Sequence, residues 1–356
     1  MSMRSYAIRR FLYIFPTLIG ITIFSFALIA LSPGDPIQIR MGLFKGEQSQ
    51  YDSMYNEIGQ EIGLLDENNQ SVNVVVRYLR WLGLMKRPIE YEFEPDGSPV
   101  YRRSGILQGD FGRSWHWSED GRIGKRITDL IVSRMWYTLF LTTPAFIIST
   151  VLATVIGVVQ ATRQYSVWDK GVTLASLIGY SMPTFWLAKL VMLASFYMFK
   201  FTGATTAEAF NEPIILNGSF YLYLILPTIT LVLTGLVFLA RLTRSQLLDI
   251  LRQDYITTAR AKGLAERVVI YKHAFRNALL PIVTVVGMAL PGLLGGAVMT
   301  EGVFGWPGLG TVFLTSSLQR DHPMMMATNF IFGTMFLVFR LFVDLSYALV
   351  DPRIRY

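Results

Sequence analysis

Between Thr257 and Pro281 the chain reads TTARAKGLAERVVIYKHAFRNALLP, a charged stretch that lies between two long apolar segments. Leu247 to Ala261 favours a helix, Gly263 offers a break, and a second helix is expected from Leu264 to Leu279, ahead of Pro281. Five apolar residues of that second helix recur at spacings of four and three: Leu264, Val268, Tyr271, Phe275 and Ala278. The stretch therefore predicts a compact helical hairpin that either seats in a groove of a soluble partner or lies on the lipid surface.

The composition of the whole chain is that of an integral membrane protein. Apolar residues make up 52% of the 356 residues, charged residues make up 16%, and the mean hydropathy is positive; a soluble domain of this size is less apolar. The formal net charge is +7, but the basic residues do not form an aromatic-rich patch, so nucleic-acid binding receives little weight. The chain has no cysteine and three histidines, which excludes disulfides and leaves metal sites unsupported.

Six apolar stretches are long enough to cross about 30 Å of hydrocarbon as helices of about 20 residues. They run approximately over residues 11–31, 136–161, 172–199, 220–240, 280–300 and 329–350. The first stretch follows Arg9 and Arg10, as in a signal peptide, but it is longer than a signal h-region and ends in an SPGDP turn at residues 32–36. We therefore expect a retained anchor and an all-α membrane protein with six transmembrane helices.

The distribution of Lys and Arg predicts that both termini and the loop over residues 241–279 are cytoplasmic. Fifteen basic residues fall before residue 11, between 163 and 170, in that loop and after residue 350, whereas two short outer loops hold only Lys200 and Arg320. The segment 32–135 holds thirteen more, but it is long enough to escape the rule. The expected divisions are residues 1–31 (N-terminus and first helix), an extracytoplasmic domain at 32–135, and a transmembrane permease core at 136–356.

Within residues 32–135 one piece of sequence predicts a β-hairpin. The run IEYEFE at residues 89–94 alternates apolar and acidic side chains, Asp96-Gly97 favours a turn, and Val100 to Arg103 can form the second strand with Arg opposite Glu. A solvated surface hairpin and a docking surface for an external partner are both compatible with this pattern.

Motifs that would supply energy or catalysis are missing from the sequence. It contains no GxxxxGK[ST] phosphate loop, no HExxH and no GxSxG. An intramembrane enzyme would need a paired Asp, a Ser with a base or a metal site within the spans, and none occurs. We therefore expect no enzyme activity, no cofactor and no metal in this chain.

A few residues in the apolar stretches are candidates for a transport pathway or gate. Proline and glycine interrupt the third and fifth stretches, where helices can bend and pack closely, at Pro183, Pro291, Gly292 and Gly295. Lys189 lies in the middle of the third stretch, where a lysine costs about 3 kcal/mol, and solute contact and a structural role are equally compatible with it. In the last stretch Arg340 and Asp344 are four residues apart, which predicts an ion pair on one helix face that is turned toward protein.

The stretch at Thr257–Pro281 resembles the EAA signature of binding-protein-dependent ABC import permeases. Its positions are occupied by Ala259, Ala261, Gly263, His273, Arg276, Asn277 and Pro281, with Thr258 in place of the leading Glu. The likeness extends over nearly the whole chain through Arg9-Arg10, SPGDP at 32–36, GDFGRS at 109–114, YSMPTFW at 180–186, RLTRS at 241–245, FGWPGLG at 304–310 and DPR at 351–353. Together these pieces resemble the DppB/OppB-type permease subunit of dipeptide and oligopeptide importers.

The resemblance implies a type I importer fold in the cell membrane, in which this chain forms half of a translocation pathway. It implies a second homologous permease subunit, two cytoplasmic ATPase subunits that bind ATP and Mg²⁺, and an extracellular solute-binding protein. In such an importer, closure of the ATPase subunits on ATP pushes the coupling helices together and turns the transmembrane helices outward. Contact with the ATPases would fall to Ala259, Arg260, Ala261, Lys262, Gly263, Leu264, His273 and Arg276. Peptides are the expected solutes, with oligosaccharides or nickel complexes as alternatives in the same family.

A self-sufficient secondary transporter is the main rival from another class. There Lys189, Arg340 and Asp344 would relay protons or bind solute, and uptake would need no ATPase. Such transporters commonly contain an internal repeat, and the sequence shows none. A purely structural scaffold is also compatible with the sequence.

Overall fold

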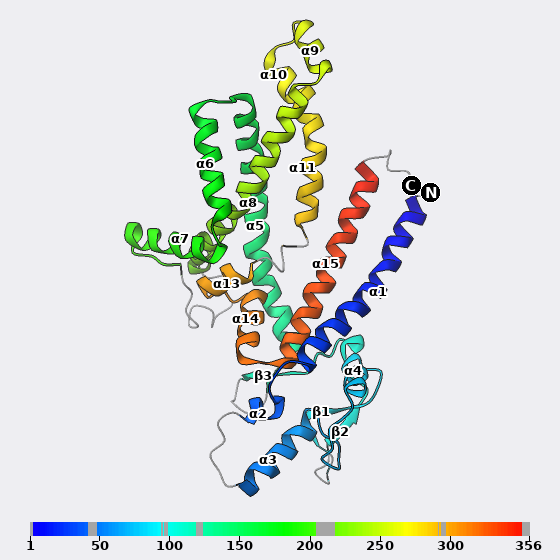
Figure 1. Cartoon of the computed structure of the whole chain (residues 1–356). Helices are drawn as coiled ribbons and strands as arrows, with labels where there is room; N and C mark the ends of the chain where they lie inside the picture. The colour runs from blue at the N-terminus through cyan, green and yellow to red at the C-terminus, as the bar shows by residue number, and fades with distance from the viewer. Residues whose placement is uncertain are drawn as a thin grey trace. The chain divides into compact units, whose positions relative to one another are not determined.

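The computed structural model of the protein (Figure 1) describes residues 3–41, 48–93, 95, 99–118, 124–203, 218–290, 292 and 297–350. These residues are mostly helical, with two small two-stranded antiparallel sheets. The chain divides into two compact units. Unit 1 contains Met1–Tyr6, Trp136–Thr311 and Phe336–Tyr356, and unit 2 contains Ala7–Met135 and Val312–Met335. Four helices run from one unit into the other: α1 (Met3–Ala30), α5 (Ile127–Thr162), α14 (Leu309–Gln319) and α15 (His322–Val350).

Unit 2 holds the strands and the short helices of the N-terminal third. Its elements are α1 (Met3–Ala30), α2 (Pro36–Met41), α3 (Gln48–Glu61), α4 (Val74–Leu82), β1 (Arg87–Phe93), β2 (Pro99–Arg102), the 3-10 helix η1 (Ile106–Gln108), β3 (Arg113–Ser118) and β4 (Gly124–Arg126). In the β1–β2 pair Pro88 lies opposite Tyr101, and an Arg102 nitrogen lies 3.4 Å from the Glu92 carboxylate. The predicted hairpin is therefore confirmed, and its predicted turn at residues 96–97 lies outside the described residues.

Two polar interactions fix the helices of unit 2. The Asn73 side chain accepts a hydrogen bond from the Val75 amide at 2.8 Å and so begins α4. The fully buried Asp321 carboxylate accepts hydrogen bonds from the Ser114 hydroxyl and from the Trp115 amide, and its other oxygen accepts from the Met324 amide at 3.2 Å. One carboxylate therefore joins β3 to the beginning of α15 (His322–Val350).

Unit 1 consists of helices. They are α5 (Ile127–Thr162), α6 (Val167–Ser181), α7 (Thr184–Phe199), α8 (Gly218–Leu251), α9 (Asp254–Ala261), α10 (Glu266–Val268), the π-helical segment η4 (Val269–Phe275), α11 (Arg276–Ala289), α13 (Val298–Phe304), α14 (Leu309–Gln319) and the end of α15. In Figure 1 the short helices α9 and α10 lie beyond the ends of α8 and α11. This end of unit 1 carries much of the stretch Thr257–Pro281.

Four helices in the described part of the chain are long and apolar enough to cross a membrane. They contain Ile8–Ala30, Ile127–Thr162, Tyr221–Leu251 and His322–Asp344, and they correspond to the first, second, fourth and sixth predicted stretches. The bent pair α6–α7 would make a fifth if it counts as one span. The chain is thus a helical membrane protein.

The predicted third stretch, residues 172–199, is interrupted at Pro183, where the sequence indicated a bend. The stretch is split into α6 and α7, which meet at an angle of 114°. Met182, the residue before Pro183, adopts extended backbone angles (φ −84°, ψ 129°) because the proline ring disfavours the helical conformation of its predecessor. The predicted fifth stretch, residues 280–300, is not one helix either, because α11 ends at Ala289 and α13 begins only at Val298.

A buried carboxylate explains the FGWPGLG sequence. Glu301 on α13 is fully buried. Its carboxylate accepts hydrogen bonds from the Thr138 hydroxyl at 2.8 Å and from the Thr311 amide at 3.1 Å. A Cβ atom on Gly308 or Gly310 would overlap that carboxylate, so the two glycines let the backbone close around it. The loop before α14 is therefore shaped by one acidic side chain.

The predicted pairing of Arg340 with Asp344 is confirmed. The Arg340 Nε lies 3.5 Å from an Asp344 carboxylate oxygen, four residues along α15. The aspartate side chain is buried, whereas that of Arg340 is 42% exposed.

We predict that Glu301→Ala lowers the free energy of unfolding by about 3 kcal/mol, because it leaves buried hydroxyl and amide donors without an acceptor. Glu301→Gln keeps one acceptor oxygen and should lose less. Thermal unfolding of the detergent-solubilised chain, followed by tryptophan fluorescence, measures the effect. The control is Glu57→Ala, which removes an exposed glutamate from α3; equal unfolding temperatures for Glu301→Ala and this control would contradict the role of Glu301.

Candidate functional site

The α9–α10 hairpin, residues 254–268, is built around a left-handed turn at Gly263. Helix α8 ends at Leu251, and Gln253 is extended before α9 begins, so Leu247–Ala261 does not form the single helix that the sequence predicted. At the end of α9 the Gly263 amide donates to the Arg260 carbonyl, and the Leu264 amide donates to the Ala259 carbonyl. These two bonds form a Schellman motif, in which the residue after the helix takes a positive φ.

Gly263 is required by its backbone conformation and not by lack of space. Its φ is +76°, and a Cβ atom placed on it would have no heavy atom within 4 Å. Side chains other than those of Gly, Asn and Asp rarely adopt this conformation. The turn therefore depends on glycine at this position.

An ion pair closes the hairpin across the turn. The Arg260 guanidinium donates to both carboxylate oxygens of Glu266, at 2.8 and 3.1 Å. This hydrogen bonding lowers the pKa of Glu266. Both side chains are largely exposed, so the pair contributes little to the free energy of unfolding. Its effect is to hold α9 and α10 in one relative orientation.

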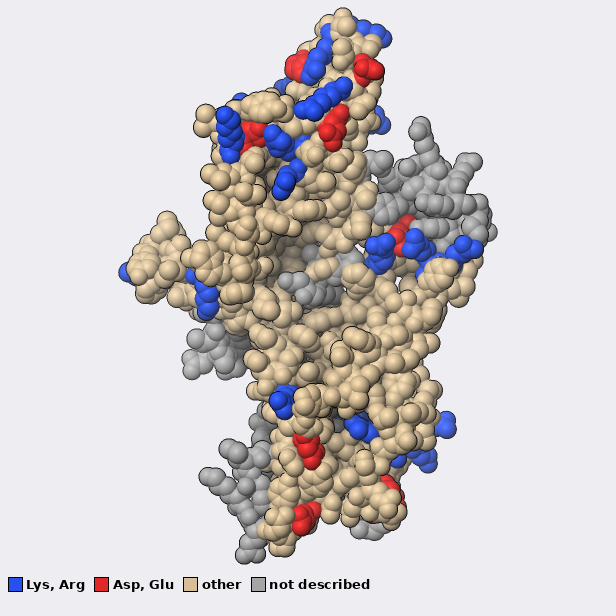
Figure 2. All heavy atoms as spheres, in the orientation of Figure 1, with Lys and Arg blue, Asp and Glu red and all other residues tan. Residues whose placement is uncertain are grey.

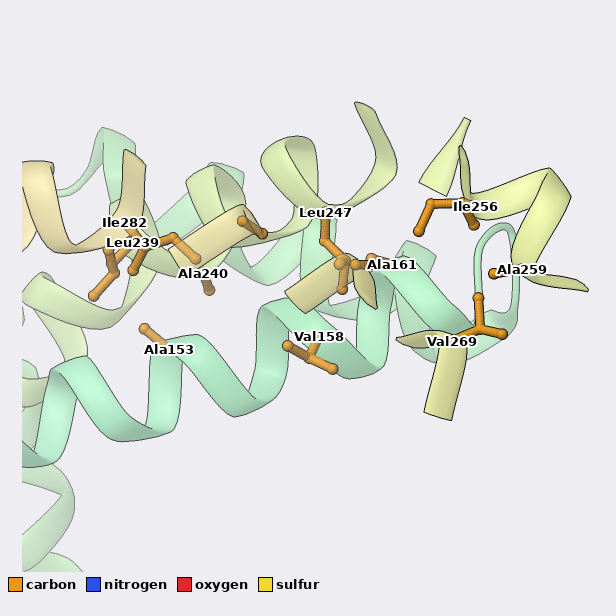
Figure 3. Close-up of a cluster of buried hydrophobic side chains, with 12 residues drawn as sticks. Ala153, Val158, Ala161, Leu239, Ala240, Leu247, Ile256, Ala259, Val269 and Ile282 are labelled. Atoms are coloured by element: carbon orange, nitrogen blue, oxygen red, sulfur yellow. The ribbon is translucent and has the colours of Figure 1, made fainter. Parts of the chain in front are cut away.

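A cluster of small and branched apolar side chains fixes the hairpin to the long helices of unit 1 (Figure 3). The buried members are Ala153, Val158, Ala161, Leu239, Ala240, Leu247, Ile256, Ala259, Val269, Ala274, Ala278 and Ile282. They come from α5, α8, α9, η4 and α11. Alanine side chains let the helix backbones approach closely. Helix α9 packs against η4, and η4 packs against α8 and continues into α11.

The π-helical segment η4 decides which face of the second helix is buried. Its buried residues are Val269, Ala274, Ala278 and Ile282, at spacings of five, four and four, because a π turn contains one residue more than an α turn. The apolar stripe predicted from a regular helical period is therefore mostly not the face that packs against the chain's own helices. Leu264, Val268 and Tyr271 are 41%, 38% and 54% exposed. Phe275 is half-buried and only Ala278 is buried.

An amide side chain at the beginning of α11 links this helix to α9. Asn277 Nδ2 donates to the Tyr255 hydroxyl at 3.0 Å and to the His273 carbonyl at 2.8 Å. The link fastens α9 to the helix that continues into α11. That helix runs from α10 through η4 and past Pro281. The sequence had predicted that Pro281 begins a new helix, but the residue lies inside this one.

The residues expected to contact a partner lie on different sides of the hairpin. Ala259 is buried in the cluster, and His273 is half-buried. The others are exposed: Arg260, Ala261, Lys262, Gly263, Leu264 and Arg276. Figure 2 shows blue and red spheres gathered at the end of unit 1 that carries α9 and α10, whereas the adjoining surface of that unit is almost entirely tan. The hairpin thus presents a charged surface with exposed apolar side chains within it.

A second ion pair near this end of unit 1 was not anticipated. The Arg244 guanidinium donates to both oxygens of Asp169, each at 2.8 Å, and only 4% of the aspartate side chain is exposed. The Tyr165 amide also donates to Asp169. The pair joins the beginning of α6 to α8, and the RLTRS sequence that contains Arg244 could have pointed to it.

The candidate pathway residues are not brought together among the described residues. Pro183 is exposed and begins α7, and Lys189 is exposed on the same helix. Gly292 is exposed, whereas Pro291 and Gly295 lie outside the described residues. A role for these five residues in a pathway or gate stays a prediction.

Comparison with known proteins decides the family. Residues 153–356 match the family described as the binding-protein-dependent transport system inner membrane component. The chain belongs to this family. The matched region includes the α9–α10 hairpin and the buried cluster beneath it, so the site just described lies within the part that defines these ABC importer permeases.

Relatives of this permease match along its whole length. The oligopeptide transport system permease protein AppB of Bacillus subtilis is 36% identical over 356 residues, which cover 99% of this chain and 100% of that protein. The dipeptide transport system permease protein DppB of Alkalihalophilus pseudofirmus is 34% identical, with 99% of this chain and 100% of that protein covered. DppB of Escherichia coli K12 is 33% identical, with 99% of each chain covered.

We predict that Asp169→Asn lowers the stability of this permease by about 3 kcal/mol, because Arg244 loses its charged partner in a largely buried position. Replacing both residues by leucine should restore part of the loss, since no unpaired charge then remains. Chemical denaturation in detergent measures both effects. The control Asp249→Asn removes an exposed charge from α8, and a double variant less stable than Asp169→Asn would contradict the pairing.

Proposed function

We propose that this permease forms half of the translocation pathway of a peptide importer, and that the α9–α10 hairpin receives the mechanical force from a partner ATPase. The observation that carries the proposal is the division of the hairpin into two surfaces. Ile256 and Ala259 are buried in the apolar cluster, whereas Leu264 and Val268, and Tyr271 just after the hairpin, are exposed and available to a partner. Exposed apolar side chains on a helical knob fit a helix-in-groove mode of recognition.

The proposed force reaches the long helices because the hairpin is held as one body. Three interactions oppose its deformation: the Schellman turn at Gly263, the Arg260–Glu266 pair and the Asn277–Tyr255 hydrogen bond. Tightly packed interiors transmit displacement with little compression. Pressure on the exposed side should therefore move α8 and α11 together and leave the hairpin itself unchanged.

The proposed partners are a second homologous permease, two ATPase subunits that hold ATP and Mg²⁺, and an extracellular solute-binding protein. The chain's membership of a binding-protein-dependent transport family supports this assembly. Since Arg260 is engaged by Glu266, we assign the cationic contacts with an acidic rim of the ATPase groove to Lys262 and Arg267, which are exposed. Both termini and the hairpin would then lie on the cytoplasmic side.

Peptides are the proposed solute class. The relatives AppB and DppB, which are named as oligopeptide and dipeptide transport permeases, support this choice. Alignment along the full length of both chains supports it further, because the likeness is not confined to the hairpin.

We predict that Gly263→Val lowers transport per ATP hydrolysed about tenfold in the assembled importer. A β-branched residue at a positive φ costs about 1–2 kcal/mol, and about 1.4 kcal/mol corresponds to a factor of ten in an equilibrium constant. Gly263→Asn is the matched control, because asparagine tolerates this conformation. Solute uptake and phosphate release are measured in the same proteoliposomes, and unchanged coupling in Gly263→Val would contradict the proposal.

We predict that proteoliposomes containing the importer take up radiolabelled di- or oligopeptides only when ATP and the solute-binding protein are supplied. Oligosaccharides and nickel complexes should not compete with this uptake. Accumulation of any of these solutes by the permease alone, without an ATPase, would instead support the secondary transporter.

A further inference from the structure

A cavity in unit 2 combines aromatic walls with arginine side chains. It measures about 120 Å³, several times the space that one water molecule needs. Its lining comes from the end of α1, from α4, from β1 and from the beginning of α15, all within unit 2. The walls include Phe26, Trp81, Phe111 and Trp115. None of these side chains belongs to the hairpin or to the pathway candidates.

Two of the arginines in the lining have no acidic partner. Arg77 and Arg80 lie three residues apart on α4 and therefore share one helix face. Neither forms an ion pair with any carboxylate in the part of the chain that the structure describes. Burial lowers the pKa of the Arg77 guanidinium, which expresses the cost of removing an uncompensated cation from water.

The acidic groups nearest this cavity are already engaged. Glu61 belongs to the lining, but its carboxylate lies 3.4 Å from Arg40. The third arginine of the lining, Arg87, pairs with Asp110 at 2.8 Å. The Asp321 carboxylate, beside the lining residues His322 and Trp115, accepts hydrogen bonds from neutral groups. Among the described residues, Arg77 and Arg80 therefore have no carboxylate within ion-pair distance.

Three N–H donors of the lining are buried without a hydrogen-bond acceptor. They are Arg80 Nε, Arg87 Nε and Trp115 Nε1. Buried donors without acceptors are rare in proteins, since each costs free energy that a bound group can recover. Together with the Arg77 guanidinium, these donors are the recognition chemistry of an oxyanion.

The cavity also lies at the ends of two membrane helices. Phe26, Ile29 and Ala30 belong to the last turns of the apolar segment Ile8–Ala30, and Pro323 and Met326 belong to the first turns of His322–Asp344. Phospholipid head groups occupy this level of a bilayer, just outside the hydrocarbon. Arg side chains there can bind phosphate in bidentate fashion.

We propose that this cavity binds a phosphate group through Arg77 and Arg80, with Trp115 Nε1 as a further donor, and that the group belongs to an anionic phospholipid of the surrounding membrane. The apolar walls formed by Phe26, Ile29 and Met326 suit the glycerol and acyl portion of such a lipid. Free inorganic phosphate offers the same oxyanion chemistry from solution, but it would leave these walls without a partner.

The test uses the full-length chain in nanodiscs of phosphatidylcholine with increasing fractions of phosphatidylglycerol. Native mass spectrometry counts the phosphatidylglycerol molecules that remain bound after release. Arg77→Gln and Arg80→Gln should each weaken retention about tenfold, because each removes a charge-assisted contact with the phosphate. The matched control is Arg103→Gln, which removes the same charge from an exposed position of unit 2 outside the cavity.

A second arm adds inorganic phosphate to the same chain in pure phosphatidylcholine and measures the shift of the unfolding temperature. A shift that Arg77→Gln abolishes, without selective retention of phosphatidylglycerol, would assign the site to free phosphate and overturn the lipid as its source. Equal retention by Arg77→Gln, Arg80→Gln and Arg103→Gln would overturn the site itself. Circular dichroism establishes that each variant is folded, and Arg77→Lys, which keeps the charge, should retain more phosphatidylglycerol than Arg77→Gln.

Discussion

Close packing of alanine side chains beneath the α9–α10 hairpin is the constraint on which the rest of the site depends. Ala259, Ala274 and Ala278 are buried in one apolar cluster that also contains residues of α5 and α8, and a larger side chain at these positions would overpack it. The hairpin consequently cannot move without the long helices to which it is fixed. A surface loop held only by hydrogen bonds to water would not have this property.

Polar interactions hold the hairpin and two other parts of unit 1 in defined arrangements. The turn at Gly263 and the Arg260–Glu266 pair hold α9 and α10 together, and the Asp169–Arg244 pair holds α6 to α8. Glu301 holds the loop before α14. Each of these contacts joins segments that are separated by a break in helix, so rigidity is concentrated where the chain changes direction.

Much of this arrangement could be predicted from sequence because it depends on local pattern. Apolar stretches located four long helices, alternation located the β1–β2 hairpin, and a spacing of four located the Arg340–Asp344 pair. The face of η4 that is buried could not be predicted from a regular helical period, because a π turn changes the period without any change in residue type. The 114° bend at Pro183 was underestimated, since a proline in an apolar stretch is compatible with a kink as well as a break. The role of Glu301 was not predicted, because its acceptor function depends on residues such as Thr138 that are distant in the sequence.

The central claim is that a partner ATPase grips the exposed side of the hairpin. Because the chain contains no cysteine, Leu264→Cys introduces a single thiol to which a photoreactive cross-linker can be attached in native membranes. Ala259→Cys is the buried control and should remain unlabelled. The account predicts a cross-link from position 264 to a polypeptide that carries a phosphate-loop ATPase, with a yield that changes when ATP is bound. Cross-links to phospholipid alone, with or without ATP, would contradict it.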